Sequence, residues 1–152
     1  MPDIDASRFT MGVFQDVAWA ERGLEALKER GFPSGALSII AKDTPETCAL
    51  VERVFVGAPA RLVLPRLGPI VAGGSLVEAL NGSAGDLARF GLAAALKRVG
   101  FQMHDGQVFE TLTSRGGVLV AVEGEPRAAD ALAVLHSFGG ANAAIGAWTG
   151  RV

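Results

Sequence analysis

The sequence predicts an α+β fold made from two β-α-β units on either side of a central segment. The first unit covers residues 8–43 and the second covers residues 116–148. In each unit a run of strand-forming residues precedes a helix with apolar residues at spacings of three and four, and a second strand follows. Two such units supply four strands and two helices, which is the inventory of a ferredoxin-like sheet with its helices on one face.

The first unit opens with the predicted strand "RFTMGVF" and continues with the predicted helix "QDVAWAERGLEALKERG". Asp16 is a fitting N-cap residue, and Gly31 is fitting just after the helix because glycine accepts a positive φ. "GALSIIAKD" completes the unit as a strand. The second unit has the same order, with "GGVLVAVEG", "EPRAADALAVLHSFGG" and "ANAAIGAW" as strand, helix and strand.

The two units match when one is shifted over the other by 108 positions. This shift pairs equivalent helix positions, which are Ala20 with Ala128, Leu24 with Leu132, Leu27 with Leu135 and Gly31 with Gly139. Because the apolar spacing is preserved, we predict an internal duplication in which all four leucines are buried. Both glycines are expected to have a positive φ.

Residues 44–115 form the centre, which we predict to be a Gly-rich, apolar helical insertion that covers the open face of the sheet. Residues 44–66 predict a short helix followed by an edge strand that Pro65 interrupts. "DLARFGLAAALKRVG" and "QMHDGQVFETLTSRG" then predict two helices rich in Leu, Ala, Val and Phe. The whole chain, residues 1–152, is expected to form a single domain.

The stretch "LGPIVAGGSLVEAL", residues 67–80, invites three interpretations: a phosphate loop, a membrane segment or a connector. A phosphate loop would need a Lys followed by Ser or Thr after its glycines, and none is present. The uncharged run ends at Glu78 and falls short of the ~20 apolar residues that span a bilayer. We therefore expect a connector that closes the core or an interface, with Ile70 and Val71 as interface residues.

Composition and charge exclude several classes of protein. Lys and Arg total 14 against 16 Asp and Glu, and the net charge of −2 gives no basic field for nucleic acid. The single cysteine, Cys48, cannot form an internal disulfide. The start "MPDIDASRFT" lacks the basic and apolar regions of a signal peptide, so we expect a cytoplasmic protein. The charges that follow residues 67–80 argue against an integral membrane segment.

Few residues suggest chemistry. His104 and Asp105 are candidate ligand-binding residues, because a carboxylate near an imidazole orients it; the alternative is a capping or surface role at a helix start. Cys48 is expected to be a small apolar residue rather than a nucleophile. We predict no catalytic residues, no metal site and no cofactor. Trp19 falls beside the buried stripe of its helix, where an exposed Trp often marks an interface.

The chain resembles a bacterial group called general stress protein or heat-induced stress protein (17M-like), whose biochemical function is unknown. The resemblance rests on "MGVFQDVAWAERGLEALKERGF", "SIIAKD", "RLGPIVAGGSLVEAL" and "GLAAALKRVGF…FETLTSRGGVLVAVEG". It covers most of the chain, its motifs are structural, and it implies no catalytic residues. Many relatives in that group have a longer Gly/Ala-rich centre described as membrane-associated, whereas this centre is shorter and carries charges.

Three functions remain open on the sequence alone. The first is a small, soluble, non-enzymatic, stress-associated binding or scaffolding protein that self-associates as a homo-oligomer. The second is a ligand carrier or enzyme with a pocket between the sheet and the central helices, in which His104 is the polar group; its small-molecule ligand is unknown. The third is peripheral membrane association through the Gly-rich centre.

Overall fold

The structure, a computed structural model, describes residues 9–55, 59–81, 85–123 and 128–137, with some side chains of the last range left out. Its strands are β1 (Phe9–Phe14), β2 (Leu37–Lys42), β3 (Ala60–Leu64), β4 (Gly68–Gly73) and β5 (Val118–Glu123). Its α-helices are α1 (Val17–Glu29), α2 (Pro45–Val54), α3 (Ser75–Asn81), α4 (Asp86–Phe90), α5 (Leu92–Arg98), α6 (Met103–Ser114) and α7 (Ala128–Ser137). A short 3-10 turn, Ser34–Ala36, precedes β2. The fold is mixed α+β, as predicted.

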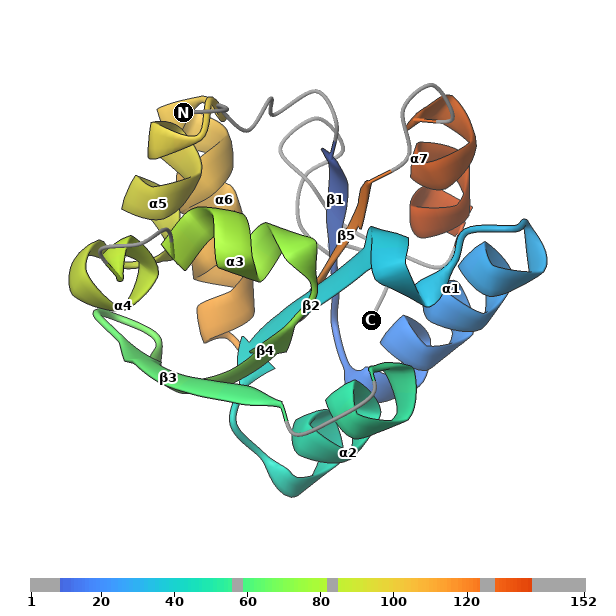
Figure 1. The fold of residues 1–152 in the computed structure, drawn as a ribbon, viewed down its shortest axis with the longest axis horizontal. Coiled ribbons are helices and arrows are strands. Elements are labelled where there is room, and N and C mark those ends of the chain that lie inside the picture. Colours follow the sequence, from blue (N-terminus) through green and yellow to red (C-terminus); the bar gives the residue numbers. More distant parts are fainter. Residues whose placement is uncertain (1–8, 56–58, 82–84, 124–127, 138–152) are drawn as a thin grey trace.

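The described strands form one antiparallel sheet in the order β1-β5-β2-β4-β3. β5 pairs antiparallel with both β1 and β2, so the two strands of the first unit are parallel to each other and separated by β5. β4 pairs with β2 and with β3, and β3 ends the sheet on that side. Figure 1 shows this sheet running through the middle of the molecule.

Helices cover both faces of the sheet, and each face has its own apolar core. On one face, side chains of α1, α2 and α7 pack against strand residues such as Ile39 and Val120. On the other face, side chains of α3, α4, α5 and α6 pack against Ile40 and Leu119. Figure 1 shows the two sets of helices on opposite sides of the sheet. The prediction that the centre covers the open face is confirmed.

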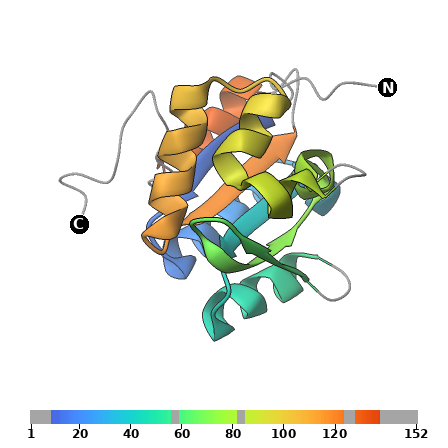
Figure 2. The same cartoon turned by 90° about the vertical axis from the view of Figure 1, so that its left-hand side faces the viewer.

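The prediction that the centre is a helical insertion is wrong in one respect, because the centre also supplies two strands. The short helix and edge strand expected within residues 44–66 are present as α2 and β3. The additional strand is β4, where the sequence predicts a connector. Figure 2 shows β3 and β4 passing between α2 and the α4 region. Gly68 and Pro69 at the start of β4 and Gly73 at its end indicate turns, and this signal concealed the apolar residues between them.

Two helix starts, those of α1 and α2, follow the sequence signals closely. Asp16 caps α1 by accepting a hydrogen bond from the Trp19 backbone N–H at 2.9 Å. Thr44 and Thr47 form a capping box at the start of α2, where Pro45 occupies the first turn. The helix expected over "DLARFGLAAALKRVG" is instead divided into α4 and α5 by Gly91, whose φ is 94°.

The duplication is described only in part. Leu24, Leu27 and Leu135 are buried, as predicted. The side chain of Leu132, the residue Gly139 and the predicted last strand "ANAAIGAW" lie outside the described residues. The described part of the second unit comprises β5 and α7, and α7 packs against α1 and β1.

Gly31 follows α1 with a φ of 92°, as predicted for a residue just after a helix. Replacing it with alanine is expected to lower the free energy of unfolding by about 1 kcal/mol, because the left-handed region is unfavourable for a residue with a Cβ. Urea denaturation would measure the change. Gly35 is the matched control, since its added Cβ meets nothing within 4 Å and its φ is not in that region. An equal loss in both variants would contradict this account.

Candidate functional site

The residues that the sequence singled out for ligand binding lie at the surface. His104 is exposed in the first turn of α6, and Asp105 next to it is half-buried. Gln102 is the N-cap of that helix, so His104 does not cap it. Within the described part of the chain, no group of three or more His, Cys, Asp or Glu side chains is placed to hold a metal ion. The expected surface role of His104 agrees with this position.

Trp19 lies on the solvent side of α1, as predicted. It is 38% exposed, whereas Ala20, Leu24 and Leu27 of the same helix are buried. The Arg22 guanidinium lies 5.0 Å from the centre of its ring, a distance at which a cation–π interaction forms. The interface role of Trp19 stays a prediction.

Ile70 and Val71 are not surface residues, and their assignment as interface residues needs correction. Both are fully buried within the chain, in adjacent positions of β4. Because successive side chains of a strand point to opposite faces, Ile70 belongs to the core under α3–α6 and Val71 to the core under α1, α2 and α7. The core alternative for this stretch is therefore the one that the structure supports.

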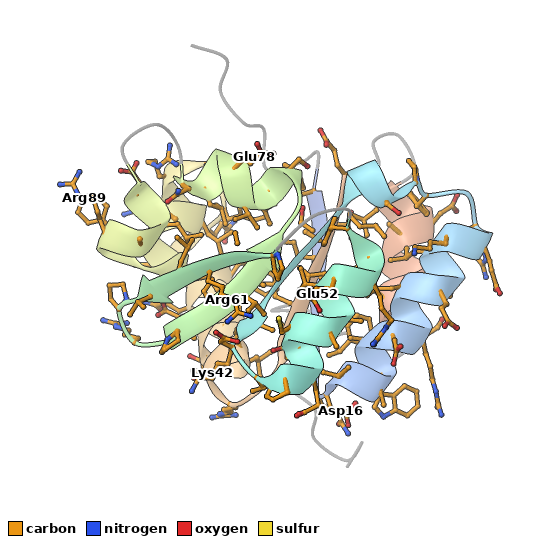
Figure 3. All side chains as sticks on the ribbon, turned by 60° about the horizontal axis from the view of Figure 1, so that its bottom comes forward. Asp16, Lys42, Glu52, Arg61, Glu78 and Arg89 are labelled. Carbon is orange, nitrogen blue, oxygen red and sulfur yellow. The ribbon has the colours of Figure 1, made fainter. Side chains whose placement is uncertain are left out.

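A shallow cleft of about 390 Å³ lies between α2 and β3. Asp43, Cys48, Glu52 and Arg61 are among its lining residues. Arg61 donates to Cys48 Sγ at 3.0 Å and lies 3.4 Å from an Asp43 carboxylate oxygen. Figure 3 shows Arg61 reaching from β3 toward the helix that carries Glu52. The residues that line the cleft include no imidazole, so the thiol has no base beside it of the kind that activates a nucleophile.

A buried carboxylate joins three segments on the opposite face. Glu110 of α6 accepts a hydrogen bond from the Ala93 N–H in the first turn of α5 at 3.2 Å. Its other oxygen pairs with the Arg66 guanidinium at 3.5 Å. Arg66 has a φ of 72°, and the Leu67 N–H donates to the Pro65 carbonyl at 2.9 Å, which closes a tight γ-type turn between β3 and β4. Glu110 thus holds the hairpin turn against the α5–α6 pair.

We predict that Glu110→Ala lowers the free energy of unfolding by about 1–3 kcal/mol, because the Ala93 N–H loses its acceptor in a partly buried position. Arg66→Ala removes only the ion pair, and its side chain is 77% exposed, so it should cost less than about 1 kcal/mol. Chemical denaturation of both variants checks the order. Equal losses would show that the Ala93 hydrogen bond contributes little.

The outer edge of β3 carries the described sheet's unpaired hydrogen-bonding groups on that side. Pro69 of β4 accepts a hydrogen bond from the Asp43 N–H at 3.1 Å, so its peptide groups face β2. Pro69 lies opposite Val63, which makes this a non-hydrogen-bonded pair of the β3–β4 ladder. Val63, and Arg61 two residues earlier, therefore direct their N–H and C=O groups away from β4.

Exposed apolar side chains accompany this edge. Val63 is 68% exposed on the face of α2, and Phe90 at the end of α4 is 57% exposed. α4 packs against β3 from the other face of the sheet. Figure 2 shows the hairpin of β3 and β4 with helices on either side of it. We call the outer backbone of Ala60–Leu64, with the Arg61 and Val63 side chains, the β3 edge.

Comparison of the chain with protein-family models, with curated proteins and with solved structures finds no match. Among the described residues, no helix combines the length and apolar character needed to cross a membrane.

The sequence predicts an edge strand before Pro65, but neither Arg61 nor Glu110 is among the predicted site residues. Arg61 is the one charge within β3, and Glu110 lies on the buried stripe of α6 with Gly106 and Thr113, four residues before it and three after it. In both cases a charged residue within an apolar pattern is the feature of the sequence that could have identified the residue.

Proposed function

We propose that this chain is a non-enzymatic, stress-associated binding or scaffolding protein that acts by self-association. The observation that carries the proposal is the β3 edge, where two residues present main-chain donors and acceptors outward. Both faces of the described sheet are packed under helices, so a partner strand reaches the sheet at an edge, and β3 is one of the two edge strands. Strand addition to such an edge is a common way for proteins to associate.

The two alternative functions have less support from the described residues. A pocket built around His104 requires other polar groups to converge on it, yet His104 is exposed and does not line the Cys48 cleft or the smaller groove between α1 and α2. Membrane contact through the Gly-rich centre requires free apolar side chains. Ile70, Val71, Leu76 and Leu80 are fully buried within the protein.

Sedimentation equilibrium of the purified chain across a wide range of concentrations tests self-association. We expect an average mass above that of one 15.7 kDa chain, rising with concentration. A single-chain mass at every concentration would contradict the proposal.

The stress association derives from the resemblance of the sequence and has its own test. Quantitative immunoblotting of the native host before and after a heat shock is expected to show more of the protein after it. An unchanged level under heat and under oxidative or osmotic stress would remove this part of the proposal.

We also propose that the fold is a duplicated, ferredoxin-like arrangement. Its support is that β5 and α7 follow each other as β1 and α1 do, and that β5 lies between the two strands of the first unit. A solved structure in which residues 141–148 pair with the outer side of β1 would agree with this proposal.

A further inference from the structure

We propose that two copies of this chain associate about a two-fold axis by antiparallel pairing of their β3 strands, centred on Leu62. The inference rests on the proposed function, since it names the surface that performs the self-association. The occupant of the β3 edge is thus a second copy of the same strand, and the pairing continues the sheet from one copy into the other.

The alternation of inward- and outward-pointing main-chain groups along β3 selects this register. Arg61 and Val63 are the residues of β3 whose N–H and C=O groups point outward. An axis at Leu62 places Arg61 opposite Val63 of the partner copy and the reverse, so all four groups of each copy find complementary ones. An axis at Val63 would instead place Arg61 opposite Pro65, which has no N–H to donate.

Prolines limit the pairing to this short ladder. In the register centred on Leu62, Pro59 of one copy lies opposite Pro65 of the other, at both ends of the strand. Neither residue donates a main-chain hydrogen bond, so the ladder ends there. A two-fold contact uses the β3 edge of both copies, which closes the assembly as a dimer instead of extending it.

The side chains of β3 are also compatible with the register centred on Leu62. The stem of Arg61 would lie over Val63 of the partner copy and cover a side chain that is 68% exposed in one copy. The Arg61 charge stays balanced by Asp43 of its own copy at 3.4 Å. On the other face the two Leu62 side chains meet at the axis, next to the core that Leu62 already contacts.

Val63→Pro is the first test. The substitution removes an outward N–H that the β3–β4 ladder does not use, so the fold should persist while the dissociation constant of the dimer rises at least ~10-fold. Val63→Thr keeps the N–H and is the matched control, which should dimerise like the parent. Circular dichroism melts of dilute samples verify that both variants fold.

Cross-linking through a new cysteine is the second test, carried out with Cys48→Ser so that the introduced thiol is alone. Leu62→Cys would place two Cα atoms about 4.5 Å apart at the axis, which is within the range of a disulfide. Val63→Cys would place them about 7–8 Å apart, which is too far for an unstrained bond. Under mild oxidation Leu62→Cys should cross-link quickly. Random collision would instead favour the more exposed position 63.

The outcomes separate the two proposals. A parent chain that self-associates, loses association with Val63→Pro and cross-links through Leu62→Cys supports both. A parent chain that self-associates but is unaffected by Val63→Pro and cross-links faster at position 63 overturns the β3 register alone. A parent chain that stays single at all concentrations overturns both, and would leave the edge to a strand from a different protein.

Discussion

Replacing Ile70 with aspartate is expected to prevent folding. The Ile70 side chain is fully buried in the core under α3–α6, and its strand pairs on both sides, with β2 and with β3. A carboxylate at this place would lose its hydration without gaining a partner, which we expect to cost at least about 4 kcal/mol. A domain of this size typically has only about 5–15 kcal/mol of stability in total.

Thermal melting and sedimentation of Ile70→Asp beside the parent chain would check this expectation. Ile70→Val is the matched control, because it removes one buried methylene and should lower stability by only about 0.5–1.5 kcal/mol. If Ile70→Asp melted at the parent temperature with the parent mass, residues 67–80 would be an exposed loop and the position of β4 would be wrong.

Replacing Gly74 with alanine is expected to have the second largest effect. Gly74 has a φ of 107°, and a Cβ built there would lie 2.4 Å from the Leu37 carbonyl oxygen and 2.5 Å from Ser38 Cα. These atoms belong to the backbone of β2 and cannot move without disturbing the sheet. The nearby Ser38 hydroxyl also accepts the Leu76 N–H at 3.0 Å, which fixes the start of α3.

We expect Gly74→Ala to lower the free energy of unfolding by about 3 kcal/mol or more, from the clash together with the strained φ. Gly68→Ala separates the two causes. Gly68 has a φ of 76° but open space around an added Cβ, so only the conformational cost of about 1–2 kcal/mol should remain. Urea denaturation measures both variants. Equal losses would mean that the turn moves away from β2 without penalty.

Local signals predicted the helices better than the sheet. Asp16 and the Thr44 capping box act within a single turn, so their neighbours in sequence are also their neighbours in space. β4 could not be recognised in the same way, because Gly68 and Gly73 at its ends are typical of turns. Its strand character comes from pairing with β2 and β3, which lie elsewhere in the chain.

The contacts of the candidate site were even harder to predict, because they join residues that are far apart in the sequence. Arg61 meets Cys48 across 13 positions of sequence, and Arg66 meets Glu110 across 44, so spacing carries no trace of either contact. His104 and Asp105, by contrast, are predicted site residues because they are adjacent in the sequence. Adjacent residues on a helix point in different directions, and His104 is exposed where Asp105 is half-buried.

The position of β5 between β1 and β2 determines when the sheet can be completed during synthesis. Phe9 of β1 lies opposite Glu123 of β5, so the first described strand must wait for more than a hundred residues to leave the ribosome. β2, β4 and β3 lie closer together along the chain and can pair earlier. Until β5 arrives, the apolar run of β1 lacks the neighbour that it has in the finished sheet, and pairings over such separations form slowly. We therefore expect a stage of synthesis in which the earliest described strand is open to chaperones and to other unfinished chains.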